Sequence, residues 1–166
     1  MRDRMRKLCA AGVFAAMVML ATMFASLPIG ATGAYMNAGE VVVYIASFVL
    51  GGWWAVAASG IGAALADILL GVAFYAPATL LIKAAVSLLA CWVMRCKFKG
   101  SEYVAPFVAG ILVPIGYFAY EWLLFGITGA LAGVVFNVIQ YIGCALIASV
   151  SFTGLKRLKR YLHLDG

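Results

Sequence analysis

Four ionisable side chains lie within long apolar stretches of the sequence: Glu40, Asp67, Lys83 and Glu121. A charged group at the centre of a bilayer costs about 2.5–3.5 kcal/mol on insertion scales, so an ionisable side chain in such a stretch commonly marks a functional site. A purely structural role is the alternative. Asp67 and Lys83 would then form one buried ion pair that only holds two helices together, and we interpret Asp67 in this way.

The segment between two of the apolar stretches, Leu27–Glu40, combines glycines with polar and aromatic side chains. Glycine permits tight backbone turns, while Tyr35, Asn37 and Glu40 can offer hydrogen bonds and ring contacts to a ligand. We expect this segment to act as a lid. The alternative is a plain connector without a binding role.

Composition places these residues in a membrane protein. Of the 166 residues, 66% are hydrophobic and only 11% are charged, against roughly 25% charged residues in a soluble domain. The mean hydropathy of +1.08 agrees. At roughly 20 residues per spanning helix, the chain 1–166 has room for one transmembrane domain and no separate soluble one.

The apolar stretches predict an all-α membrane protein, a compact bundle of six transmembrane helices, because helices satisfy their own backbone hydrogen bonds in lipid. The second stretch is too short for a full upright crossing. The expected spans are 8–27, 41–50, 53–72, 77–94, 103–125 and 130–152.

The basic residues predict the orientation. Eleven of the twelve Lys and Arg residues lie in three clusters, at 2–7, 95–99 and 156–160. Six spans place all three clusters on one side, which the positive-inside rule assigns to the cytoplasm. Both termini are therefore expected in the cytoplasm. The formal charge of +6 is a topology signal, and no nucleic-acid partner is expected.

This orientation places the polar intramembrane groups in the outer half of the bilayer. Asn137 and Gln140 would lie there too, one helical turn apart on a shared face. A proton relay or channel needs polar groups through the full thickness. The distribution therefore favours a pocket that opens to the outside and is closed below by apolar packing.

Small residues on the first span suggest close helix contacts. Ala11 and Ala15, and likewise Gly12 and Ala16, are small residues four apart near the cytoplasmic end. Such pairs let helix backbones approach closely in lipid. The contact is either with an external helix or within the bundle.

Several kinds of chemistry have no support in the residues. The sequence contains no phosphate-binding G-x-x-x-x-G-K-[ST] loop, no zinc motif and one histidine, His163, in the tail. We therefore expect no catalytic residues, no metal and no cofactor in this chain.

In combination and order, several motifs resemble those of S components, the substrate-binding membrane subunits of energy-coupling factor (ECF) transporters. The segment Gly33–Tyr44 resembles the family pattern G-Y-x-N-x-G-[DE], with Glu40 where Asp is usual. Further resemblances lie in Gly60–Asp67, Tyr75–Lys83, the Asn137–Gln140 pair and Ala11–Ala15. The chain most resembles the short members assigned to hydroxymethylpyrimidine or pyridoxine.

The resemblance implies a subunit that captures a small vitamin or precursor from outside a bacterial cytoplasmic membrane. It would then topple against a transmembrane scaffold (T) subunit, with two cytosolic ATPase (A) subunits supplying energy, and Ala11 and Ala15 would contact the scaffold. Other vitamins, such as riboflavin, thiamine or niacin, remain open, as does a stand-alone proton-coupled transporter. An intramembrane enzyme and a non-transport subunit are further alternatives.

Both lines of reasoning lead to one expected binding site. Tyr35, Asn37 and Glu40 would close over the ligand. The remaining members would hydrogen-bond its polar edge or stack on its ring, and they are Tyr75, Lys83, Tyr120, Glu121, Asn137 and Gln140.

Overall fold

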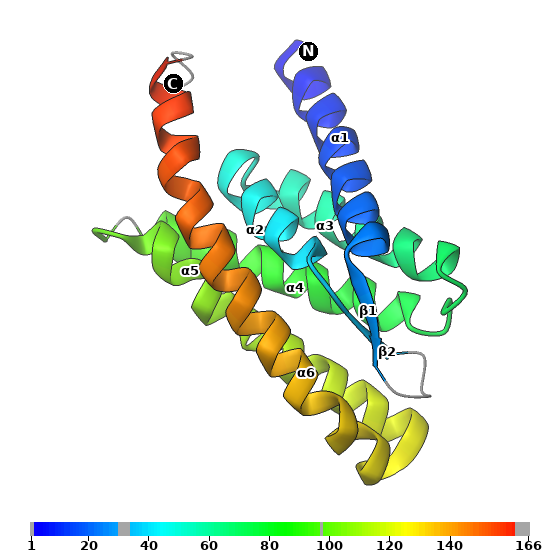
Figure 1. The fold of residues 1–166 in the computed structure, drawn as a ribbon. Coiled ribbons are helices and arrows are strands. Elements are labelled where there is room, and N and C mark those ends of the chain that lie inside the picture. Colours follow the sequence, from blue (N-terminus) through cyan, green and yellow to red (C-terminus); the bar gives the residue numbers. More distant parts are fainter. Residues whose placement is uncertain (1, 30–33, 97, 162–166) are drawn as a thin grey trace.

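The chain folds almost entirely into helices, so the predicted all-α class is confirmed apart from one short hairpin. The computed structural model describes residues 2–29, 34–96 and 98–161, arranged as in Figure 1. The elements are α1 (Arg2–Phe24), β1 (Ser26–Ile29), β2 (Ala34–Asn37), α2 (Gly39–Val49), α3 (Gly52–Leu69), α4 (Ala76–Arg95), α5 (Ser101–Gly110) and α6 (Leu112–Tyr161).

Several of these helices have the length and composition of membrane spans. Within the described residues, four helical stretches qualify: Asp3–Phe24, Gly52–Leu69, Ala76–Arg95 and Ser101–Arg157. The helix α2 is apolar but has only 11 residues. The sequence indicated the same weakness in the second expected span.

The segment expected as a lid or connector, extended by Ser26, contains the only strands among the described residues. Residues 26–29 pair antiparallel with residues 34–37, and Pro28 lies opposite Tyr35. Proline lacks a backbone N–H and is tolerated in an edge strand. The first helix accordingly ends at Phe24, before the expected boundary at 27.

Two interruptions shape the C-terminal half of the chain. The helices α5 and α6 are separated at Ile111, where Pro114 lacks the N–H that would bond to the carbonyl of Gly110. Gly126 has φ 72° and ψ −179°, which joins two helices within α6. The chain reverses there, so α6 has a first limb (112–125) and a second limb (127–161), as Figure 1 shows.

Close helix contacts depend on small residues. A Cβ atom at Gly62 in α3 would lie 2.4 Å from the backbone oxygen of Ala15 in α1, and one at Gly60 would lie 3.0 Å from the Leu80 oxygen in α4. The backbones of α1, α3 and α4 can approach this closely because these positions lack side chains. Buried apolar side chains fill the centre between α2, α4, α5 and α6, including Val43, Val86, Ala109 and Phe152.

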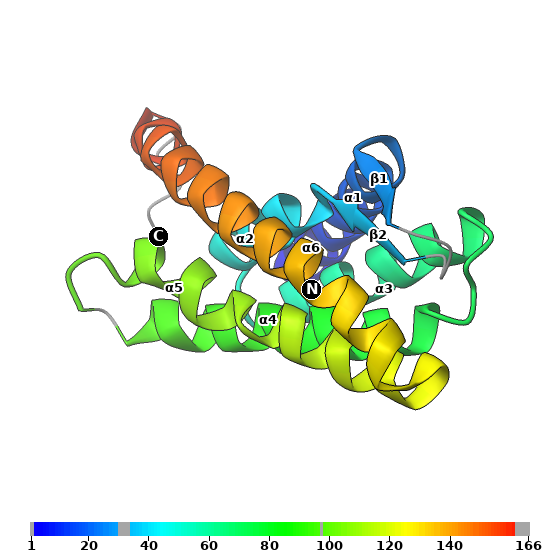
Figure 2. The ribbon, with the colours of Figure 1, turned by 60° about the horizontal axis from the view of Figure 1, so that its bottom comes forward.

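Both ends of the described chain lie at the same end of the bundle, on α1 and on α6 (Figure 1). The β1–β2 hairpin and the reversal within α6 lie toward the other end. Figure 2 shows the hairpin from that side, next to α1 and α6, and β2 contacts both helices.

The contact between Gly62 and Ala15 makes a prediction about stability. Gly62→Ala should lower the thermal unfolding midpoint of the detergent-purified protein, because overpacking a closely packed contact typically costs about 1–3 kcal/mol. Gly12→Ala is the matched control on the partner helix, since a Cβ there meets nothing within 4 Å. Equal midpoints for the two variants would contradict the close α1–α3 contact.

Candidate functional site

The base of the hairpin is fixed between α1 and the start of α2. Ser26 lies opposite Asn37 in the strand register, and the Ala38 N–H donates to the carbonyl of Ala25 at 3.1 Å. The first turn of α2 therefore begins directly after β2. A chain that leaves β2 has no free length before it enters the membrane bundle.

Gly39 permits this geometry. A Cβ atom there would lie 2.0 Å from Thr22 Oγ1 and 2.9 Å from Asn37 Oδ1, and Thr22 is buried. The Gly39 N–H donates to Asn37 Oδ1 at 3.0 Å. The next residue, Glu40, then lies in the first turn of α2, where a helix N-terminus favours a carboxylate.

Glu40 and Lys83 form a buried ion pair between α2 and α4. Their side chains are 0% and 2% exposed, and Lys83 Nζ donates to Glu40 Oε2. The ammonium also lies 5.7 Å from the ring centroid of Tyr117 in the first limb of α6. Three segments far apart in the sequence therefore meet at one charged centre.

This pairing differs from the structural alternative raised by the sequence, in which Lys83 was paired with Asp67. The ion pair of Lys83 that the structure shows is with Glu40. Asp67 is also buried, near the end of α3, and its backbone carbonyl accepts a hydrogen bond from Val72 N–H at 2.9 Å. The partner of Lys83 is therefore Glu40, at the end of the expected lid segment, and not Asp67 of α3, the helix that precedes α4.

Asn37 joins the hairpin to the second limb of α6. Its N–H donates to Gln140 Oε1 at 2.6 Å, and its carbonyl accepts from Cys144 Sγ at 3.6 Å. Asn37, Gln140 and Cys144 are all buried. The hairpin is therefore held on α6 by polar contacts that are shielded from solvent.

A second polar group surrounds Glu121 in the first limb of α6. Tyr75 Oη donates to Glu121 Oε1 at 3.2 Å, and Glu121 Oε2 has no hydrogen-bond partner among the described residues. A Cβ at Gly133 would lie 2.3 Å from that oxygen, so the second limb passes directly over the carboxylate. Asn137, one turn further along, is buried as well.

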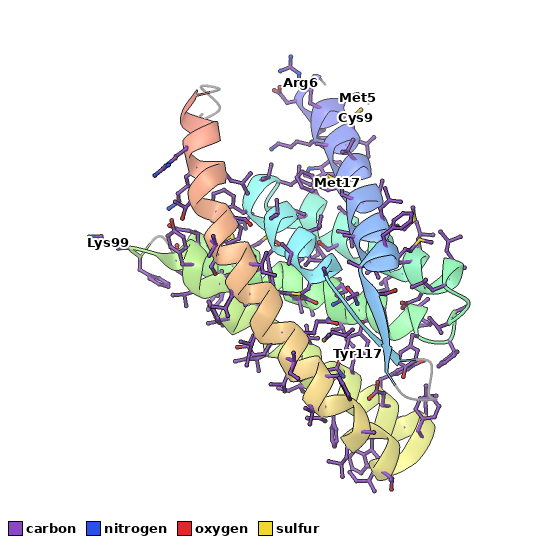
Figure 3. The ribbon with its side chains drawn as sticks, in the orientation of Figure 1. Met5, Arg6, Cys9, Met17, Lys99 and Tyr117 are labelled. Atoms are coloured by element: carbon purple, nitrogen blue, oxygen red, sulfur yellow. The ribbon has the colours of Figure 1, made fainter. Side chains whose placement is uncertain are left out.

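The predicted aromatic residues cluster beside Glu121. The rings of Tyr75 and Tyr120 have centroids 5.7 Å apart, and Tyr120 Oη donates to the Phe74 carbonyl. Tyr75 also packs against Met36 of β2 and against Tyr117, which Figure 3 labels. The cluster therefore borders the hairpin. The backbone of Tyr35 lies in β2, and its side chain is outside the described residues.

The structure places the two small pairs of α1 on different faces. Ala11 is buried, and Ala15 packs its backbone against Gly62 of α3. Gly12 and Ala16 are exposed. The Ala11–Ala15 face is therefore used within the bundle at least in part. Figure 3 shows the N-terminal part of α1 with the labelled Met5 and Cys9 outward, and both residues are exposed.

Sequence reasoning missed several residues of this region. Tyr44 is fully buried one turn after Glu40, and Tyr117 hydrogen-bonds Thr79 at 3.0 Å. Ser47 and Ser87 bond to each other at 2.9 Å. A search of the helical positions four and seven after Glu40, and four after Lys83, would have found Tyr44, Ser47 and Ser87.

A cavity of about 290 Å³ borders the contact between the hairpin and α6. Its polar wall contains Asn37, Gln140 and Cys144, and the remaining lining is apolar. Gln140 Nε2 is buried and has no hydrogen-bond partner in the part of the chain that the structure describes. A second cavity of about 310 Å³ lies at the other end of α2 and α4, beside Arg95. Within the described ranges, no three His, Cys, Asp or Glu side chains form a group that could hold a metal ion.

Comparison with known proteins identifies the family. A family model described as "ECF-type riboflavin transporter, S component" matches residues 2–157. The chain belongs to this family. The predicted membership in the ECF S components is thereby confirmed, and the chain is a multi-pass membrane subunit of a transporter. Its family is one of transport subunits and not of enzymes.

Two individual proteins are also similar. A relative from Pyrococcus woesei, described as an uncharacterized protein in gap 3'region, is 28% identical over 131 residues, which cover 78% of this chain and 88% of the relative. A solved structure described as "Structure and mechanism of the S component of a bacterial ECF transporter" is 19% identical. It has a TM-score of 0.76 and covers 96% of this chain and 98% of its own. That likeness supports the shared fold.

The buried ion pair leads to a prediction that separates the effect of charge on stability from the effect of packing. Lys83→Met should lower the thermal unfolding midpoint sharply, because breaking a buried pair typically costs about 3–5 kcal/mol by leaving one charge without its partner. Glu40→Gln in the same protein should restore much of the loss. A double variant that is less stable than Lys83→Met would show that the two charges do not compensate each other.

Proposed function

We propose that this S component captures a small, flat, polar heteroaromatic vitamin or precursor from outside the membrane. The ligand would lie beneath the β1–β2 hairpin. Hydrogen bonds would come from Asn37, Glu40, Lys83, Glu121, Asn137 and Gln140, and ring contacts from Tyr35, Tyr75 and Tyr120.

One observation supports this proposal above the others. Buried polar side chains come from the hairpin, α2, α4 and both limbs of α6, although each would be costly alone in lipid. Two of them, Asn37 of the hairpin and Gln140 of the second limb, line a cavity. A few convergent polar groups in an otherwise apolar pocket are typical of a small-ligand site. Family membership in a transporter supplies the reason for such a site.

Charge and size bear on the identity of the ligand. Glu40 and Lys83 neutralise each other, so their pair favours a ligand without net charge. The cavity of about 290 Å³ is small for a ligand site, since such sites commonly measure roughly 300–1,000 Å³. A single ring of the hydroxymethylpyrimidine or pyridoxine type fits this size. Riboflavin is the second candidate, because the matching family model names it.

The orientation and partners belong to the same proposal. Six crossings, with α5 and the first limb of α6 forming the fifth, would place the three basic clusters in the cytoplasm of a bacterial cell. A scaffold subunit and two ATPase subunits would drive uptake, and the S component would topple to release its ligand inside. On α1, the exposed Gly12 and Ala16 suit the scaffold contact better than the buried Ala11.

A stand-alone proton-coupled transporter is less well supported. It would use Asp67, Lys83 and Glu121 as a proton path, yet Lys83 is bound in an ion pair with Glu40. Below that pair, Ser47 and Ser87 bond to each other, and a serine hydroxyl is not a group that relays protons by titrating near neutral pH.

A ligand panel tests the proposed substrate class. Pyridoxine or hydroxymethylpyrimidine should raise the thermal unfolding midpoint of the purified protein, because a ligand at 100 times its Kd stabilises the folded state by about 2.7 kcal/mol. Riboflavin, thiamine, niacin and pantothenate complete the panel. Asn137→Ala should lower the affinity for the active compound without lowering the midpoint of the ligand-free protein by a comparable amount. No response to any compound would contradict the proposal.

Reconstitution tests the mode of transport. Proteoliposomes with this chain alone should bind the panel ligand without sustained uptake, and uptake should require the scaffold and ATPase subunits. Gly12→Leu should reduce uptake by the full complex while ligand binding stays unchanged, because Gly12 is exposed and distant from the hairpin. Val13→Ala is the control on the same exposed face. Uptake by the chain alone, driven by a pH gradient, would favour the proton-coupled alternative.

A further inference from the structure

We propose that Gln140 is a positioning residue that couples ligand binding to closure of the hairpin. One end of its amide, Oε1, holds the hairpin through Asn37, and the other end, Nε2, binds a hydrogen-bond acceptor on the ligand. This inference rests on the proposed function, because it assigns a role within the same site.

The contact between Gln140 and the hairpin is already formed in the structure. The Asn37 N–H donates to Gln140 Oε1 at 2.6 Å, across 103 positions of the sequence. Because the backbone N–H can only donate, the acceptor must be the amide oxygen, and the amide nitrogen must point elsewhere. The orientation of Gln140 is therefore set by the hairpin.

The other end of the Gln140 amide, Nε2, is available to bind a ligand. Gln140 is 3% exposed, and its Nε2 has no hydrogen-bond partner among the described residues. The same side chain lines the cavity of about 290 Å³. A buried amide donor without a partner costs about 1–3 kcal/mol. A ligand that brings a carbonyl oxygen or a ring nitrogen to Nε2 would remove this cost.

Asn37 links the end of the hairpin to α6 and to the start of α2 through both its backbone and its side chain. Its N–H bonds to Gln140, its carbonyl accepts from Cys144, and its side-chain oxygen accepts from the Gly39 N–H. The hairpin cannot leave α6 at this point without breaking contacts of both its backbone and its side chain. Gly39 also touches Thr22 of α1, so the displaced hairpin would have to move past that helix.

The coupling follows from the planarity of the amide. A ligand acceptor at Nε2 fixes the plane of the Gln140 side chain and thereby fixes Oε1 opposite the Asn37 N–H. A closed hairpin, in turn, orients Nε2 toward the cavity. Linkage requires that the two effects be equal in free energy, so a ligand that uses Nε2 must stabilise the closed hairpin.

The natural thiol of Cys144 reports on closure. Cys144 is buried and bonded to the Asn37 carbonyl, so maleimide should reach it only when the hairpin opens. Replacing the other cysteines, Cys9, Cys91 and Cys96, by alanine leaves one labelling site. In the ligand-free protein, Gln140→Met should label roughly tenfold faster, because it keeps the volume and loses the bond to Asn37. Gln140→Glu keeps an acceptor for Asn37 and should label near the wild-type rate.

Ligand added to the same proteins tests the other end of the amide. Pyridoxine and riboflavin are the probes, and the one that binds should slow Cys144 labelling in the wild type. Gln140→Glu lacks the Nε2 donor, so its affinity should fall roughly tenfold. Val135→Ala, on the lipid-facing side of the same limb, is the control and should match the wild type in both measurements.

The outcomes separate the two proposals. A wild-type labelling rate for ligand-free Gln140→Met would overturn the hairpin contact of Gln140, whatever the ligand is. Equal ligand affinity of wild type and Gln140→Glu would overturn the role of Nε2. If neither probe nor any other panel compound binds, the ligand role and the proposed function both fail, while the rate for Gln140→Met still decides whether Gln140 holds the hairpin.

Discussion

The buried ion pair between Glu40 and Lys83 is the constraint on which the rest of the site depends. In a bilayer interior each charge alone would cost about 2.5–3.5 kcal/mol or more, so the two side chains must stay in contact. Lys83 is fixed in the middle of a long helix, whereas Glu40 follows the hairpin by only three residues from Asn37. Because the Glu40 carboxylate must contact Lys83 in α4, the hairpin just before Glu40 can occupy only positions that allow this contact.

Close packing makes this arrangement possible. Helices in lipid lack a hydrophobic force that pushes them together, so contact depends on small residues and hydrogen bonds. Gly39 brings the start of α2 against Thr22, and Gly133 brings the second limb of α6 over Glu121. At both positions a polar group lies where a side chain would otherwise be. The glycines therefore bring polar atoms close to neighbouring helices in addition to shortening the distances between those helices.

The sequence predicted the class of fold and the family, and it singled out polar residues that the structure buries, because apolar stretches and isolated charges are local features. It did not predict the partner of Lys83. Asp67 lay nearer along the chain, and only the hairpin geometry brings Glu40 to α4. The strands were missed for a related reason, since pairing of Ser26–Ile29 with Ala34–Asn37 depends on docking against two helices. The burial of Ala11 likewise depends on which face of α1 meets α3.

The polar contacts that run inward from the ion pair indicate a closed site and not a path through the membrane. Below Glu40 and Lys83, Ser47 and Ser87 satisfy each other, and Ser47 also donates to the carbonyl of Val43 at 2.8 Å. Such mutual bonds hold α2 and α4 together and leave little for a permeating solute to bind. Toward the hairpin, Gln140 and Glu121 each keep a buried atom that has no hydrogen-bond partner among the residues the structure describes. Buried amide and carboxylate atoms with unused hydrogen-bonding capacity on the hairpin side are what a capture subunit needs to hold a ligand there. Under the proposed function, a ligand held on the hairpin side would be released on the opposite side by motion of the subunit and not by passage through it.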